Sequence, residues 1–106
     1  MKIVTTDEIP GFEIVEVLGL VKGNTIRARN IGRDIVAALK NITGGEIEEY
    51  TKMIAESREQ AMDRMVEEAE SLGADAVVGT RFGTTAVMSG AAEILVYGTA
   101  VRIKAM

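Results

Sequence analysis

The chain of 106 residues contains neither cysteine nor histidine. Their absence removes thiolate nucleophiles, the usual ligands of zinc and softer metal ions, and the side chain most often used as a general base near neutral pH. No disulfide can form, so the sequence carries no information about a redox compartment. We therefore expect no enzyme activity, no cofactor and no metal site.

Long apolar runs are missing as well. No stretch approaches the roughly 20 apolar residues that a membrane-spanning helix needs, and the N-terminal residues MKIVTTDE lack the apolar core of a signal peptide. The net charge of −4 argues against a nucleic-acid partner, which requires a basic face. These absences predict a cytoplasmic protein with neither a membrane nor a nucleic acid as partner.

The residues that are present suit one ordinary globular domain. Hydrophobic residues make up 47% of the chain and charged residues 26%. This balance is typical of a folded protein and not of a disordered one. A chain of this length builds one modest core, so we predict a single domain over residues 1–106.

Residues 43–73 form the longest periodic stretch. Apolar side chains recur there at steps of three and four, the spacing of one helix face, and acidic residues fill most of the other side. The predicted stripe comprises Ile47, Tyr50, Ile54, Arg58, Ala61, Met65, Ala69 and Leu72. We predict one long amphipathic helix with a single guanidinium in its buried stripe, and a capping box of Thr43 and Glu46 at its start.

Runs rich in β-branched residues surround this helix. We predict an edge strand, a long strand with a bulge at Gly19, a turn at Gly23-Asn24 before a further strand, a short helix, and two antiparallel C-terminal strands. In order, the ranges are Lys2–Thr5, Phe12–Val21, Thr25–Arg29, Asn30–Asn41, Ala74–Val87 and Glu93–Lys104. The predicted fold class is α+β, a small antiparallel sheet packed on one long helix plus one short helix.

The strands are apolar on both faces. Phe12–Val21 alternates imperfectly, as expected of a strand covered on both sides, and both parities of Glu93–Lys104 are mainly apolar. One helix covers only one face of a small sheet, and the other face would leave an apolar patch larger than soluble monomers usually expose. The pattern therefore predicts a homo-oligomer held by sheet faces or edges.

Arg58 is the most unusual residue of the predicted helix. A buried guanidinium needs acceptors for several N–H groups, and Asp34 and Glu46 are the expected partners. A structural or interface ion pair is the favoured interpretation. The alternatives are an arginine that reaches the rim of the interface and one that binds an anion in a pocket.

Four further arginines could bind an anionic metabolite or phosphate through charge-assisted hydrogen bonds. They are Arg27, Arg29, Arg33 and Arg81. Scattered salt bridges with the acidic helix are the favoured interpretation, because the spacing matches no phosphate-binding motif. Arg27 and Arg81 nevertheless join Arg58 as candidate ligand-binding residues.

Metal binding has two possible chemistries in this sequence. Carboxylates such as Asp34, Glu46 and Glu49 could hold a hard cation, and methionine thioethers of the long helix could attract Cu(I). Methionines on an apolar helix face usually pack in a core. We therefore assign no residue as a metal ligand.

Five segments of the sequence, taken in order, match a known family. They are IRARNIGRDI (Ile26–Ile35), GGEIEEYT (Gly44–Thr51), the Arg58–Met65 segment, LGADAVVG (Leu72–Gly79) and EILVYGTAV (Glu93–Val101). In these segments the chain resembles the YbjQ family of small proteins. The resemblance implies an α+β subunit with a sheet on a long helix, assembled as a ring-shaped homo-oligomer, a homopentamer. It also brings a heavy-metal-binding label and no established enzymatic activity.

The sequence thus leaves three functions open. The leading hypothesis is a cytoplasmic homo-oligomeric module, structural or binding a small ligand at subunit interfaces, whose partner is a second copy of itself. The second is a metal-binding protein that uses carboxylates, because the sequence offers no cysteine or histidine. The third is a binder of anions or metabolites through arginines at the interface.

Overall fold

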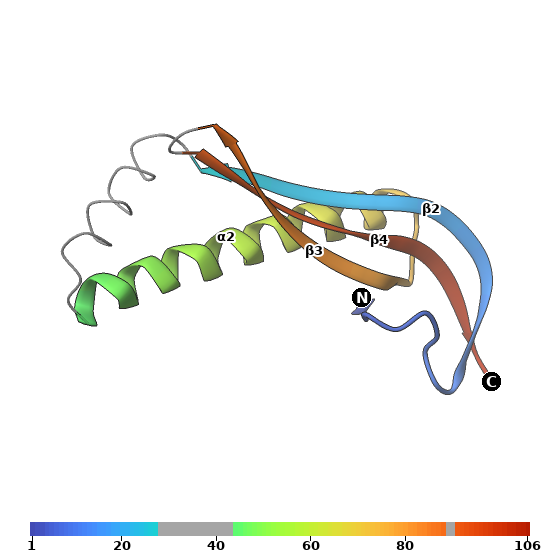
Figure 1. Ribbon diagram of the computed structural model, residues 1–106. Coiled ribbons are helices and arrows are strands. Elements are labelled where there is room, and N and C mark those ends of the chain that lie inside the picture. The colour runs from blue at the N-terminus through green and yellow to red at the C-terminus, as the bar shows by residue number, and fades with distance from the viewer. Residues whose placement is uncertain (28–43, 89–90) are drawn as a thin grey trace.

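In the computed structural model, which describes residues 1–27, 44–88 and 91–106, one long helix lies against a four-stranded sheet (Figure 1). The elements are β1 (Lys2–Ile3), β2 (Phe12–Arg27), α2 (Gly44–Ser71), β3 (Ala76–Met88) and β4 (Ala91–Ala105). The strand order is β1-β3-β4-β2. These elements confirm the predicted α+β class, the edge strand and the antiparallel C-terminal pair.

The direction of one pair of neighbouring strands in the sheet differs from the prediction. Strand β4 runs antiparallel to both β2 and β3, but β1 runs parallel to β3. The predicted purely antiparallel sheet is therefore wrong, and the sheet is mixed. The reason is topological, since the chain leaves β1 at one edge of the sheet and enters β2 at the opposite edge.

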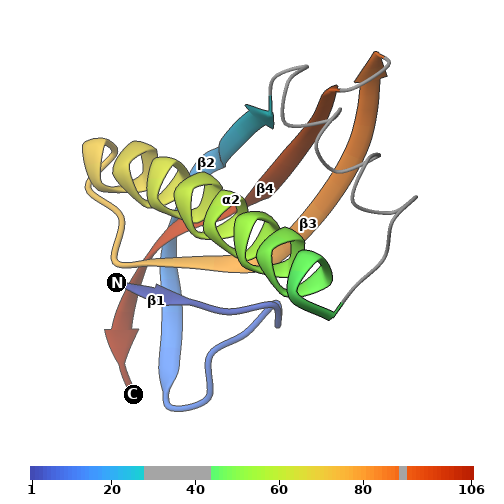
Figure 2. The ribbon, with the colours of Figure 1, turned by 90° about the vertical axis from the view of Figure 1, so that its left-hand side faces the viewer.

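Helix α2 confirms the predicted amphipathic helix. Its side chains Ala61, Met65 and Ala69 are fully buried and pack on β2 and β4, so the helix covers one face of the sheet (Figure 2). We call this the inner face and the opposite one the outer face. The strands contribute Val21, Val77, Ile94, Val96 and Ala100 to the inner core. Gly73, with a φ of 77°, follows the helix in the left-handed conformation that glycine commonly adopts after a helix C-terminus.

The turn predicted at Gly23-Asn24 is wrong, because β2 continues unbroken through both residues. Gly23 is buried beneath α2, and a Cβ built on it would collide with the carbonyl oxygen of Ala61 and the amide nitrogen of Met65. Glycine is therefore required here for close approach of helix and strand and not for a positive φ. Nearby, the hydroxyl of Thr25 donates to the Ser57 carbonyl at 3.3 Å.

Two bulges interrupt β2. Its pairing with β4 shifts between Ile14 and Glu16 and again between Val17 and Gly19, which confirms the bulge predicted at Gly19. Each bulge adds one residue, so Ile14, Val17 and Leu20 lie on the same face despite their spacing of three. The imperfect alternation of this segment comes from the bulges. In the single chain the outer face of β2 is exposed, and its cover by a second copy stays a prediction.

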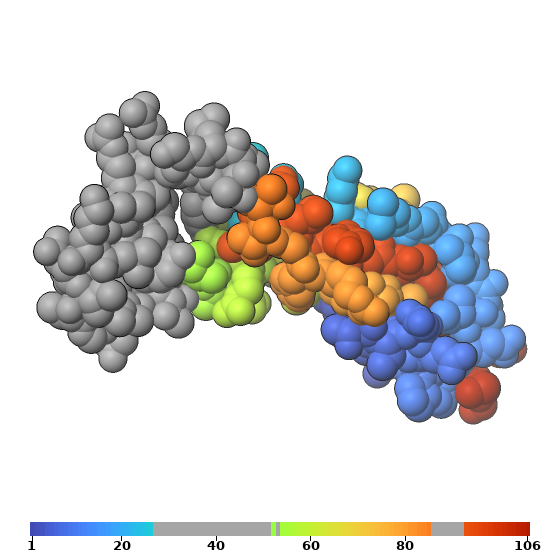
Figure 3. All heavy atoms as spheres, in the orientation of Figure 1, coloured from blue at the N-terminus to red at the C-terminus, as the bar shows by residue number. Residues whose placement is uncertain are grey.

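The N-terminal segment, residues 4–12, covers part of the outer face. Ile9 and the strand residues Ala76, Val78 and Val101 form a second, smaller core there. Pro10 and Gly11 form a turn there, which is closed by the hydrogen bond from the Phe12 amide to the Ile9 carbonyl at 3.0 Å. The rest of the outer face, along β2 and the start of β4, lies outside this cover (Figure 3).

The predicted short helix Asn30–Asn41 and the Thr43 cap lie outside the described residues. Within the described part of the chain, no helix is long and apolar enough to span a membrane. The molecule is elongated, with extents of 55 × 25 × 17 Å. This shape follows from a helix of 28 residues laid along strands of 13 to 16 residues.

Candidate functional site

Arg58 occupies the stripe of α2 but is exposed. The prediction that it lies buried is therefore wrong for the single chain, in which the neighbouring stripe residues Ala61 and Met65 are the buried ones. Asp34 lies outside the described residues, and only the backbone of Glu46 is described, within α2. The pairing of Arg58 with Asp34 and Glu46 stays a prediction.

Arg81 makes hydrogen bonds within the chain. Its Nη1 donates to the carbonyl oxygens of Thr5, at 2.8 Å, and of Thr80, at 2.9 Å. Arg81 pairs with Tyr97 on the outer face of the sheet, whereas Arg58 lies on the helix of the inner face. One chain therefore does not bring these two guanidinium groups together.

Of the other predicted basic residues, Arg27 ends β2, and the structure describes its backbone alone. Arg27 pairs with Ala92, five residues along β4 from the partner of Arg81, and the two arginines lie on opposite sides of β4, so their backbones are about 20 Å apart. Arg29 and Arg33 lie outside the described residues. A shared anion site of Arg27 and Arg81 would need long side chains to converge across this distance.

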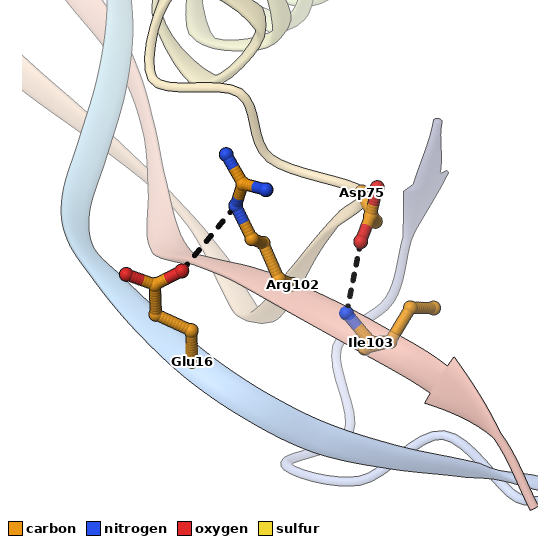
Figure 4. Close-up of polar contacts among 4 residues, drawn as sticks. All are labelled: Glu16, Asp75, Arg102 and Ile103. Carbon is orange, nitrogen blue, oxygen red and sulfur yellow. Dashed lines mark hydrogen bonds and ion pairs between the residues drawn. The ribbon is translucent and has the colours of Figure 1, made fainter.

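The clearest polar contacts lie where the chain leaves α2 (Figure 4). The Asp75 carboxylate accepts a hydrogen bond from the Ile103 backbone amide at 3.0 Å. Arg102 Nε lies 3.3 Å from the Glu16 carboxylate, and both side chains are more than half exposed. The first contact fixes the entry of β3 against β4, and the second bridges the bulged part of β2 to β4.

We expect Asp75→Ala to lower the free energy of unfolding by about 1 kcal/mol, because the Ile103 amide loses its acceptor. Glu16→Ala should cost less than about 0.5 kcal/mol, since an exposed ion pair gains little over water. Urea denaturation followed by circular dichroism measures both changes. An equal loss for the two variants would contradict this ranking.

An exposed apolar stripe follows the outer face of β2, which forms one edge of the sheet. Its residues on β2 are Ile14, Val17, Leu20 and Ile26, with exposed fractions of 36%, 66%, 65% and 59%. Tyr97 of β4, 40% exposed, lies on the same face opposite Lys22. We call these five apolar residues the outer stripe, which the exposed side chains of Lys22 and Asn24 interrupt between Leu20 and Ile26. Sequence reasoning missed it. The signal was the spacing of three in residues 14–20, which two bulges convert into one face.

A second exposed apolar surface lies on the inner face, beside α2. Phe82 of β3 is 48% exposed although its neighbour on β4, Val96, is fully buried under the helix. One flank of α2 reaches β2, where Arg64 donates to the Asn24 carbonyl at 2.6 Å. The opposite flank therefore faces the β3 side of the sheet. We call the residues around this side the inner patch, which comprises Ile54, Arg58, Met62, Phe82 and Thr84.

Carboxylates do not converge in the described part of the chain, where no group of three or more acidic side chains is placed to hold a metal ion. Met62 and Met65 of α2 pack in or against the inner core, as expected for methionine on an apolar helix face. The described residues thus offer no donor set for a heavy-metal ion.

The fold and these surfaces can be compared with known proteins. The family model YbjQ_1, described as "Putative heavy-metal-binding", matches residues 1–104. The chain belongs to the YbjQ family. A UPF0145 protein of Methanococcus vannielii is 62% identical over 100 residues, which cover 94% of this chain and 95% of that protein. A UPF0145 protein of Archaeoglobus fulgidus is 58% identical over 102 residues, 96% of this chain and 94% of that protein.

A solved structure shares the fold of this YbjQ-family chain. It is the crystal structure of a protein of unknown function, of the DUF74 family, from Pediococcus pentosaceus. The TM-score is 0.66 at 18% sequence identity, over 98% of each chain. The resemblance to the YbjQ family stated from the sequence is confirmed. The heavy-metal description of the family finds no matching donor set, because the chain lacks cysteine and histidine and its described carboxylates do not cluster.

Proposed function

We propose that the chain is the subunit of a cytoplasmic homo-oligomer, a pentameric ring by its resemblance to the YbjQ family, whose role is structural or the binding of a small ligand between subunits. The observation that carries the proposal is the outer stripe. Four of its five residues come from one edge strand, and three of them are more than half exposed. Ile14, Val17 and Leu20 follow one another on this face, and contiguous exposed apolar side chains of this kind mark interaction sites.

The dimensions of the chain support the same proposal. A compact domain of this length has a radius of gyration of about 13 Å, whereas the chain measures 17.0 Å. Its accessible surface is 6925 Å², against about 5,800 Å² expected for a folded monomer of this mass. An elongated subunit with excess surface is typical of a chain that completes its core by assembly.

Native mass spectrometry of protein taken directly from cells is the test. We expect one main species at a multiple of 11.4 kDa, five times that mass for the pentamer. The same spectrum reports any retained anion, metabolite or metal ion, and so separates a structural module from a ligand binder. A single species of 11.4 kDa at micromolar concentration would overturn the proposal.

A small anion or metabolite bound between subunits is the second candidate. Arg58 supports it, because an exposed guanidinium one helical turn from Met62 would be partly desolvated once a neighbouring subunit packs there. A retained anion of fixed mass, lost from Arg58→Gln while the oligomer persists, would distinguish this candidate from a structural module.

A further inference from the structure

We propose that the outer face of the sheet binds a nucleotide-like ligand, a single flat aromatic ring that carries a phosphate group. The site is a row of three side chains on neighbouring strands. Tyr97 of β4 pairs with Lys22 of β2 on one side and with Arg81 of β3 on the other. We call these three residues the basic row. The inference deepens the ligand-binding form of the proposed function, on which it rests, by naming a site and a class of ligand.

The register of the sheet places all three side chains on the outer face. Val21 and Val96, which directly precede Lys22 and Tyr97 in the chain, are fully buried in the inner core. Successive side chains of a strand alternate between its faces, so Lys22 and Tyr97 point away from α2. Arg81 pairs directly with Tyr97 and shares its face. Two strand spacings separate the backbones of the two cations, about 10 Å, with the tyrosine between them.

The two cations of the basic row are not neutralised by the chain. Neither Lys22 nor Arg81 has a carboxylate within ion-pair distance among the described residues. Lys22 also makes no hydrogen bond in this part of the chain, and both side chains are exposed. The net charge of the whole chain is −4. Two unpaired cations on the face away from the acidic helix therefore form a local surface that attracts anions.

The guanidinium of Arg81 is held in place by the chain itself. Its Nη1 donates to the carbonyl oxygens of Thr5, at 2.8 Å, and of Thr80, at 2.9 Å. The N–H groups of Nε and Nη2 have no acceptor among the described residues. A side chain that is already fixed loses less entropy when it binds a ligand. The remaining donors suit phosphate, to which arginine makes strong charge-assisted hydrogen bonds.

The ring of Tyr97 is available for stacking. Tyr97 is 40% exposed on β4, which lies between β2 and β3 on the outer face (Figure 3). Neither cation of the basic row lies over this ring, since the cation–π contact of the described residues joins Lys2 to Phe12. In RNA-binding sheets, aromatic side chains on an open sheet face stack on bases, and nearby cations contact the phosphates. One ring accommodates one base, and a chain of negative charge disfavours a longer polyanion.

The basic row also gives a role to residues that assembly through the outer stripe leaves unexplained. Lys22 lies on the face of the outer stripe, between Leu20 and Ile26, and interrupts its apolar surface. A cation that becomes buried between subunits is costly unless an opposite charge compensates it. A bound phosphate supplies this charge to Lys22 and Arg81 together.

Equilibrium dialysis at low ionic strength tests the inference with three probes. Adenosine monophosphate carries the ring and the phosphate, adenosine carries the ring alone, and inorganic phosphate is the anion alone. We expect adenosine monophosphate to bind at one molecule per chain and about tenfold more tightly than either of the other two. If it binds no more tightly than inorganic phosphate, the ring does not stack and the inference is wrong. The absence of any binding would also overturn it.

Matched variants assign the binding to the basic row. We expect Lys22→Gln and Tyr97→Ala each to weaken the binding of adenosine monophosphate about tenfold, and Tyr97→Phe to keep it because the ring remains. Both positions are exposed, so the fold should persist, as circular dichroism checks. The control is Lys52→Gln, which removes an exposed lysine from α2 on the other face and should bind as the unmodified chain does. A Lys22→Gln chain that binds as tightly as this control would place the site elsewhere.

Native mass spectrometry of the same samples separates the inference from the proposed oligomer. A chain that assembles but does not bind adenosine monophosphate contradicts the inference and leaves the oligomer in place. A monomer of 11.4 kDa that binds the probe would refute the oligomer and support the site, because all three residues of the basic row belong to one chain. Arg81 is left unchanged in these variants, since its bonds to Thr5 and Thr80 also hold the N-terminal segment.

Discussion

Replacing Gly23 with alanine is expected to lower the free energy of unfolding by about 3 kcal/mol. The added Cβ would overlap the backbone of α2 at the Ala61 carbonyl and the Met65 amide. The backbone atoms of a helix are held by its hydrogen bonds, so they cannot rotate away from the added Cβ as a flexible side chain could. The helix would have to move away from β2, and the buried contacts of Met65 would loosen with it.

Gly83→Ala is the matched control for this prediction. Gly83 also lies in a strand, but no atom lies within 4 Å of the position that its Cβ would take. The control should change stability by less than about 0.5 kcal/mol. Urea denaturation of both variants, with far-ultraviolet circular dichroism as the signal, gives the comparison. A Gly23→Ala chain as stable as Gly83→Ala would show that the helix does not pack this closely.

Met65→Ala should destabilise the chain by about 3 kcal/mol. Met65 is fully buried, and it is the largest side chain in the core with no exposed surface. Its removal leaves a cavity between α2 and the sheet, which Val21, Val96 and Ala100 cannot fill without moving. Against a typical total stability of about 5–15 kcal/mol, this loss is large.

The control for the cavity is Met106→Ala, the same substitution at a methionine that is 83% exposed. We expect a change below about 0.5 kcal/mol. Thermal unfolding measured at one protein concentration should rank the two variants, because oligomers make the melting temperature depend on concentration. Equal melting temperatures for the two variants would exclude Met65 as a central core residue.

The sequence predicted those helices and strands whose hydrophobic spacing can be recognised within one continuous segment. The steps of three and four in residues 43–73 gave the helix, and the stripe residues Ala61, Met65 and Ala69 are indeed its buried positions. It could not give the parallel pairing of β1, because nothing in Lys2–Ile3 says which strand will lie beside it. A glycine in a strand sequence is compatible both with a turn of positive φ and with close approach by a helix. The sequence alone does not distinguish the two at Gly23.

The candidate sites were less predictable than the fold. Arg58 lies on the predicted stripe, but a periodic pattern shows which side of a helix is apolar and not which residues of that side the strands cover. Arg81 was proposed for ligand binding, and its bond to Thr5 comes from a segment 76 residues away. The outer stripe needs the bulges of β2 to exist, and bulges are hard to locate without the partner strand.

The bulges of β2 have a consequence for solubility. The 16 residues of β2 lie along only the 14 residues of β4 from Ala92 to Ala105, so the edge strand is longer than its neighbour and bends around it (Figure 1). A straight apolar edge is a template on which further chains stack without limit into fibrils. A bent and twisted edge resists this open-ended stacking. The same irregularity that hides the stripe from sequence analysis thus protects the chain from amyloid-like aggregation.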